Sequence, residues 1–123
     1  MILSKKSILE AIEGGDMAIS PFNEENLKEA SYSFTIAEEI TLDPNEFRVV
    51  ETREHVTLSA YISCLLSTRG SIAQSGIDAL NSSIFCEPGS DNTLKLEVVN
   101  HSHKTITLPA YTPIAKGVFL RVA

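Results

Sequence analysis

Cysteine is scarce in this sequence, with only Cys64 and Cys86 among 123 residues. Two cysteines exclude a four-cysteine zinc site by count, and they are too few for a disulfide-rich secreted scaffold. They fit a reducing compartment, so we expect a cytoplasmic protein. Long apolar runs are also missing: none approaches the roughly 20 residues that span a bilayer, and the first six residues lack the apolar core of a signal peptide. We therefore expect no membrane partner.

Positive charge is in deficit as well. Ten Lys and Arg stand against sixteen Asp and Glu, which gives a net charge of −6 and a sequence pI near 5.0. General binding to nucleic acid or to anionic membranes needs the opposite sign, so we expect neither. An anionic ligand would need a local cluster of cations or a metal ion. A hydrophobic content of 43% in 123 residues predicts one globular domain with a single core.

The helical signal is confined to the first third of the chain. A helix is predicted over Lys5–Glu13, because Ser4 is a candidate N-cap, apolar residues recur at helical spacing, and Gly14-Gly15 supplies a stop. The next segments are predicted to be extended over 16–22 and a short helix over 23–29.

From residue 33 onward the pattern changes to short β runs separated by turns. Such a series predicts an all-β sandwich or barrel rather than βαβ units. We expect a single domain over 1–123, with a helical and extended segment over 1–32 and a barrel over 33–123. The expected runs are Phe34–Ile36, Ile40–Leu42, Phe47–Thr52, His55–Leu58, Tyr61–Leu66, Ile77–Leu80, Ser83–Cys86, Thr93–Asn100, Lys104–Leu108 and Ile114–Val122.

Glu97 is the first candidate functional residue. It lies in a strand pattern in which Leu94, Leu96 and Val98 alternate with more polar positions, so its side chain is expected on the face opposite the leucines. Most lone glutamates on a strand simply face solvent. The alternative is a functional role for this side chain.

A polar stretch after the run at 61–66 is the second candidate. Ser67–Gly76 contains Arg69, two glycines and three serines. A turn of this composition can direct backbone N–H groups and a guanidinium at an anion such as phosphate. It is not a Walker loop, since the Gly-x4-Gly-Lys-Ser/Thr pattern is absent. An ordinary polar connection between strands is the alternative.

Two further stretches are weaker candidates. Glu87 and Asp91 flank a Pro-Gly turn, which accounts for their polarity without a site. His101-Ser102-His103 has two of the three or more ligands that a metal site needs, so a hairpin turn is favoured there. The patterns of the zinc nucleobase deaminases and of the Gly-x-Ser-x-Gly hydrolases are both absent from the sequence.

Taken in order along the chain, several motifs resemble those of the dCTP deaminases, which share the fold of the trimeric dUTPases. Each motif is weak alone, but the ordered set covers most of the sequence. The matching segments are Ile2-Leu3-Ser4, Ile19-Ser20-Pro21-Phe22, Ala30-Ser31-Tyr32, Leu42-Asp43-Pro44-Asn45-Glu46-Phe47, Thr68–Gly76, Glu87-Pro88-Gly89, Leu94–Asn100 and Leu108–Phe119.

The resemblance implies a mostly β protein, a distorted jelly-roll β-barrel with a short N-terminal helix, that forms a homotrimer with nucleotide sites between subunits. It implies that Glu97 activates water for attack on cytosine C4 without zinc, and that Glu87 positions water or sugar. It assigns dCTP or dUTP as substrate, with Mg²⁺ acting only through the phosphates. The substrate-binding residues that it implies are Arg69, Gly70, Ser71, Gln74, Ser83 and Lys116.

The sequence also departs from the family pattern. Gly70 replaces the first serine after the arginine, Gln74 a second arginine, Glu87 an aspartate, and Lys116 a glutamine. A carboxylate moved by about 1 Å can cost roughly 10²-fold in rate. The family's C-terminal lid has no counterpart, so we expect an open site.

Three interpretations follow from these departures. The chain is a minimal dCTP deaminase or dUTP diphosphatase, or the same trimer without catalysis, acting as a nucleotide-binding or structural module. A third interpretation is a monomeric β-barrel that serves an unrelated partner.

Overall fold

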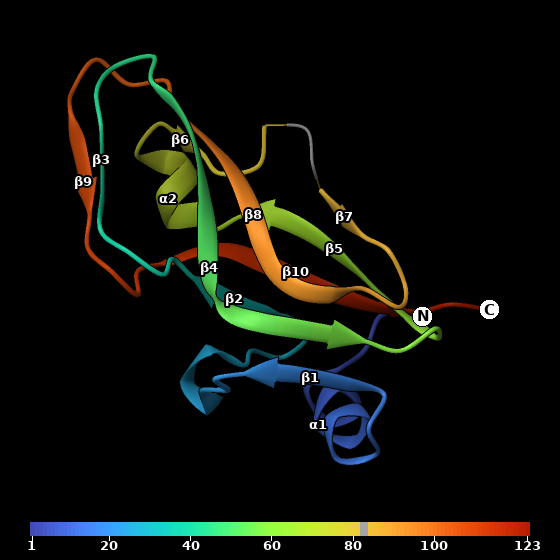
Figure 1. Cartoon of the computed structure of the whole chain (residues 1–123). Coiled ribbons are helices and arrows are strands. Elements are labelled where there is room, and N and C mark those ends of the chain that lie inside the picture. Colours follow the sequence, from blue (N-terminus) through green and yellow to red (C-terminus); the bar gives the residue numbers. More distant parts are fainter. Residues whose placement is uncertain (82–83) are drawn as a thin grey trace.

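The computed structural model describes residues 1–81 and 84–123, in which the strands form two four-stranded sheets and one two-stranded sheet (Figure 1). The first sheet has the order β1-β4-β8-β6, the second β2-β10-β5-β7, and the third pairs β3 with β9. The strands are β1 (Met17–Ser20), β2 (Tyr32–Thr35), β3 (Ile40–Leu42), β4 (Phe47–Leu58), β5 (Ile62–Thr68), β6 (Ile77–Asp78), β7 (Phe85–Cys86), β8 (Asp91–Asn100), β9 (Ile106–Leu108) and β10 (Pro113–Arg121).

The predicted N-terminal helix is confirmed with the same bounds, as α1 (Lys5–Glu13). The hydroxyl of Ser4 accepts a hydrogen bond from the backbone N–H of Ser7, which satisfies one of the free donors of the first turn. At the other end, the N–H of Gly14 bonds to the carbonyl of Glu10. Among the described residues, no helix is both long and apolar enough to cross a membrane.

The next two segments also follow the prediction in type. Residues 17–20 form β1, which pairs with β4, so the chain before residue 33 adds a strand to the first sheet. Asn23 caps a short helix through its side-chain oxygen, but this helix is the single 3₁₀ turn η1 (Glu24–Asn26) and does not reach Glu29.

Two predicted β runs are a single strand. The charged residues between 51 and 55 suggested a break, but β4 continues from Phe47 to Leu58 with a register shift between Glu51 and His55. At this bulge the Thr52 hydroxyl replaces main-chain partners: it accepts from the N–H of Leu94 and donates to the carbonyl of Glu54.

The bulge also turns a carboxylate inward. Glu54 is only 2% exposed, and its two carboxylate oxygens accept hydrogen bonds from the backbone N–H and the hydroxyl of Thr35 on β2. A buried carboxylate needs such donors, and here they link the first sheet to the second.

The expectation that only the first third is helical was wrong. Residues 70–74 form a short helix, α2 (Gly70–Gln74), which follows β5 directly. No side chain caps it, so local sequence gives little signal. Ile72 is buried in the core and α2 packs against β6, so tertiary contacts hold this helix in place.

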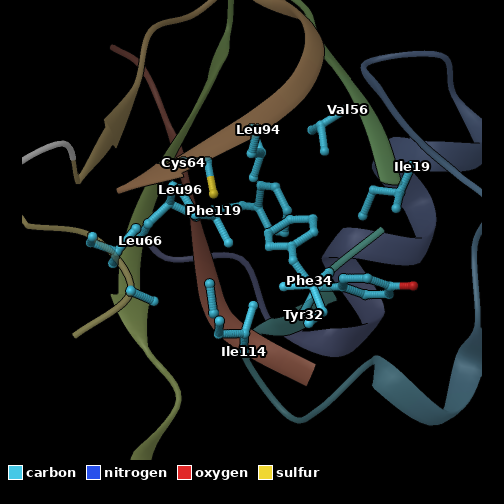
Figure 2. Close-up of a cluster of buried hydrophobic side chains, with 14 of the residues drawn as sticks. Ile19, Tyr32, Phe34, Val56, Cys64, Leu66, Leu94, Leu96, Ile114 and Phe119 are labelled. Atoms are coloured by element: carbon cyan, nitrogen blue, oxygen red, sulfur yellow. The ribbon is translucent and has the colours of Figure 1, made fainter. Parts of the chain in front are cut away.

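The core is built from the inward faces of both large sheets and from α1 (Figure 2). Position 117 in β10 needs a glycine, because the Phe34 ring and the Cys64 thiol occupy the space that a side chain would fill. The largest wholly buried apolar side chains are Tyr32, Phe34, Phe119, Ile8, Ile36, Leu42, Ile62, Ile77, Leu96 and Ile114.

Candidate active site

Glu97 projects from β8 on the face opposite the buried Leu96 and Val98, as the alternation predicted. It is not freely solvated, however. The side chain is half-buried, and its Oε1 atom is buried without a hydrogen-bond partner in the part of the chain that the structure describes. A carboxylate oxygen that has lost water and gained no donor is costly, and native proteins keep few of them. The Oε1 atom of Glu97 can therefore accept a hydrogen bond from a donor that the described residues do not supply.

The face around Glu97 is apolar in one direction along the strands and charged in the other. Its register partner on β4 is Val49; the next pair on this face is Phe47 with Val99 on one side and the ion pair of Glu51 with Lys95 on the other. Phe47 and Val49 are each 52% exposed. Exposed apolar side chains that neighbour one another on a sheet are typical of surfaces that another molecule covers. We call Phe47, Val49, Glu97 and Val99 the β4–β8 outer face.

Asn100 fixes the end of the strand that carries Glu97. Its side chain is wholly buried and donates to the carbonyls of Leu42 and Lys104, at 3.0 and 2.8 Å. Its Oδ1 accepts from the N–H and the hydroxyl of Ser102. These bonds close the tight connection at 101–104. It joins β8 to β9, which lie in different sheets, so the predicted hairpin turn was wrong. Sequence reasoning missed this positioning role, because the contacts with Leu42 are remote in sequence.

The candidate phosphate loop lies at the end of β5. The backbone N–H of Arg69 donates to the carbonyl of Ile114 on β10, and Lys116 is the register partner of Ser67. The structure therefore brings both candidate cations, Arg69 and Lys116, to neighbouring strands of one sheet. Gly70, Ser71 and Gln74 are exposed on α2, so the predicted polar turn is a helix start rather than an open loop.

Glu87 is exposed in a turn, which confirms the predicted turn chemistry. The N–H of Ser90 donates to the Glu87 carbonyl, and Gly89 has φ +83°. Glu87 lines a hollow of about 360 Å³ together with Cys86, Leu94 and Lys95, among others, but Glu97 is not one of its lining residues. The two candidate catalytic glutamates thus point to different places within one chain. Ser83 lies outside the described residues.

The described residues contain no group of three or more His, Cys, Asp or Glu side chains that could hold a metal ion. His55 and Asp91 also form a pair, with Nε2 and Oδ1 2.6 Å apart. Hydrogen bonds from His55 and Thr57 hold the pKa of Asp91 below its usual value. Both side chains are exposed, and the pair joins β4 to the start of β8.

The family follows from a comparison with protein-family models. The model described as dCTP deaminase-like matches residues 33–122. The chain belongs to the dCTP deaminase-like family. Among curated relatives, this dCTP deaminase-like chain is 28% identical over 105 residues to the dUMP-forming dCTP deaminase of Methanosphaerula palustris, covering 85% of this chain and 56% of the relative. It is 27% identical over 122 residues to the dCTP deaminase of Pyrococcus abyssi, covering 87% and 78%.

Solved structures confirm the fold. The 2′-deoxycytidine 5′-triphosphate deaminase from Agrobacterium tumefaciens superposes with a TM-score of 0.82 at 14% identity, covering 99% of this chain and 48% of that one. The EIAV dUTPase superposes with a TM-score of 0.69 at 13% identity, covering 85% and 88%. The dCTP deaminase-like chain thus has the mostly β, dUTPase-type fold that was predicted. It spans about half the length of the Methanosphaerula and Agrobacterium proteins.

Proposed function

We propose that this chain deaminates dCTP by hydrolysis, giving dUTP and ammonia, at a site completed between subunits of a cytoplasmic homotrimer. The observation that supports the proposal is Glu97, whose buried Oε1 has no partner in the described residues, at the position where the family motif has its water-activating glutamate. The family membership and the printed names of the relatives give the substrate class.

In this deamination one carboxylate, that of Glu97, would transfer a proton in two successive steps. Glu97 takes a proton from water and delivers it to ring N3 as the resulting hydroxide adds to C4 of the pyrimidine ring. Glu97 then takes the proton of the new C4 hydroxyl and passes it to the exocyclic nitrogen, which leaves as ammonia as the C4–N bond breaks and the C4 carbonyl forms. A positioned carboxylate can act as general base and then as general acid in such steps. No metal is needed for these steps.

The phosphates would be held at the end of β5. A triphosphate carries about four negative charges and the chain already carries a net −6, so the cations must be local. Arg69 and Lys116 supply two positive charges from neighbouring strands. Mg²⁺ bound to the phosphates would offset much of the remaining charge. Gly70, Ser71 and Gln74 are exposed on α2 beside Arg69 and can contact the same group.

The β4–β8 outer face would supply the subunit contact. Its exposed Phe47 and Val49 become buried if another copy covers them, and the same event brings donors to Glu97. In this arrangement, Glu97 of one subunit works with the Arg69 loop of its neighbour. The separation of Glu87 from Glu97 within one chain is consistent with a site shared between copies.

The deciding experiment is a nucleotide assay. The purified protein is incubated with dCTP and with dUTP, with and without Mg²⁺, and dUTP, dUMP and ammonia are measured. We expect ammonia from dCTP, and a loss of about 10²-fold or more in Glu97→Gln, since that variant lacks the base. Glu51→Gln is the matched control, because Glu51 is an exposed carboxylate on the neighbouring strand, paired with Lys95. Equal turnover in the wild type and Glu97→Gln would refute the role of Glu97.

A catalytically degenerate nucleotide-binding or structural trimer is the second candidate. It is favoured by Gly70 and Gln74, which replace residues of the family's phosphate motif, and by Glu87 in place of an aspartate. It predicts no product from either nucleotide but a higher unfolding temperature with dCTP or dUTP, since a ligand at 100 times its Kd adds about 2.7 kcal/mol. Release of dUMP from dUTP would indicate a diphosphatase instead. A monomer by light scattering would contradict both trimeric candidates.

A further inference from the structure

The two cysteines are register partners on adjacent strands. Cys64 of β5 lies directly opposite Cys86 of β7, in an antiparallel pair. Opposed residues in such a pair point to the same side of the sheet, with Cα atoms about 4.5–5.5 Å apart. A disulfide needs a Cα separation of about 4.4–6.8 Å, so backbone spacing permits a bond between these residues. Both are free thiols in this structure.

The two thiols differ in access. Cys64 is wholly buried among core side chains (Figure 2), and its register partner on β10 is Phe119. Cys86 is half-buried and lines the 360 Å³ hollow beside β8, so a small solute can reach it from solvent. The geometry therefore makes Cys86 the thiol that meets an oxidant and Cys64 the thiol behind it.

Their contact also favours this order. A hydrogen bond with the Cys64 thiol lowers the pKa of Cys86, although burial opposes that shift. The same hydrogen bond, together with burial, raises the pKa of Cys64 well above its usual value. The thiolate is the form that reacts with peroxides, so Cys86 is the more reactive of the two.

We propose that Cys86 and Cys64 form a reversible redox pair that a hydroperoxide converts to an intramolecular disulfide. The Cys86 sulfur attacks one oxygen of hydrogen peroxide, the O–O bond breaks, and hydroxide leaves as water with the thiol proton, giving a sulfenic acid. The Cys64 sulfur then forms the S–S bond as the S–O bond breaks, and hydroxide leaves with the Cys64 proton as a second water. Two electrons pass from the thiols to the peroxide.

The disulfide would link the edge strand β7 covalently to its neighbour β5. β7 has only two residues, and the next residue after Cys86 is Glu87. An intracellular disulfide of this kind is typically transient and redox-sensing. An effect of oxidation on nucleotide turnover rests on the function proposed above. The formation of the disulfide does not.

The test is peptide mapping of the full chain after dilute hydrogen peroxide and thiol alkylation. Trypsin cuts after Arg53, Arg69 and Lys95, so Cys64 and Cys86 fall in the peptides 54–69 and 70–95. We expect a protein about 2 Da lighter, since two hydrogens leave, with these peptides linked until dithiothreitol is added. The cross-link should raise the unfolding midpoint by on the order of 10 °C.

Single variants separate the steps. In Cys64→Ala, Cys86 should stop at the sulfenic acid and react with dimedone. In Cys86→Ser, which changes the half-exposed partner and spares the core, Cys64 should stay reduced at peroxide doses that convert the wild type. Unfolding curves of the reduced variants show that each one folds.

Three outcomes would overturn the proposal. They are linkage between two chains, over-oxidation of Cys86 with Cys64 still free, and equal oxidation of Cys64 with and without Cys86. Turnover of dCTP is measured on the same samples. A disulfide in a protein that turns over no nucleotide would refute the proposed function and leave the redox pair standing.

Discussion

Asn100 offers the sharpest test of how the strand that carries Glu97 is held. In Asn100→Ala, three buried or partly buried backbone groups lose a side-chain partner: the carbonyls of Leu42 and Lys104, and the N–H of Ser102. At about 1 kcal/mol for each hydrogen bond, the free energy of unfolding should fall by about 3 kcal/mol. For a domain of this size, that lowers the midpoint of thermal unfolding by on the order of 10 °C.

The assay is urea and thermal unfolding followed by circular dichroism. Asn92→Ala is the matched control, because Asn92 is exposed near the start of the same strand, and its variant should stay within about 0.5 kcal/mol of wild type. The midpoint should move while the slope against urea stays constant. A loss in Asn100→Ala no larger than in the control would refute the idea that this side chain holds the end of β8. Loss of turnover with unchanged stability would assign Asn100 to the chemistry instead.

Two further predictions concern stability. Gly117→Ala should cost about 1–3 kcal/mol in an unfolding experiment, because an added Cβ would lie 2.5 Å from the Phe34 ring; Gly70→Ala, where the added atom meets open space, should change little. Asp91→Asn tests how stability depends on pH in the acid range. The pKa of Asp91 is lower in the folded state than its unfolded value of 3.8, so the ionised carboxylate stabilises the fold above pH 3.8. This contribution is lost as pH falls through the folded-state pKa. The difference in unfolding midpoint between wild type and Asp91→Asn should therefore shrink on acidification, and a constant difference would show that the bond to His55 carries no charge-dependent stability.

Where local rules decide the structure, the sequence was sufficient. The first helix is capped by Ser4 and ends at Gly14, and both residues adjoin the helix in the sequence. The Glu87–Ser90 turn is likewise set by Pro-Gly chemistry. The alternation around Leu96 placed Glu97 on the correct face, because side chains of a strand alternate whatever its neighbours are.

Where distant residues decide, the sequence was insufficient. α2 lacks a side-chain cap and exists because Ile72 is buried against the barrel. The charges at 51–55 suggested a gap, but Thr52 and Glu54 find partners on β8 and β2 that lie far along the chain. The pairing of the two cysteines likewise depends on the register of β5 with β7.

The candidate site was predicted in outline only. The motif order indicated Glu97 and Arg69 as members, and the family match over residues 33–122 supports that choice of family. Sequence could not give the isolation of the Glu97 Oε1 atom, because that depends on how β4, β6 and β8 pack. Nor could it show that Glu87 and Glu97 lie apart in one chain.

The close packing at Gly117 makes the surroundings of the two thiols unequal in rigidity. The Phe34 ring and the Cys64 sulfur both pack beside Gly117 of β10 in the interior, while Cys86 lies on a two-residue strand at the edge of its sheet. Any drawing together of the two sulfurs must therefore displace the rim rather than the interior. The turn that contains Glu87 would move, while the rest of the barrel would keep its position.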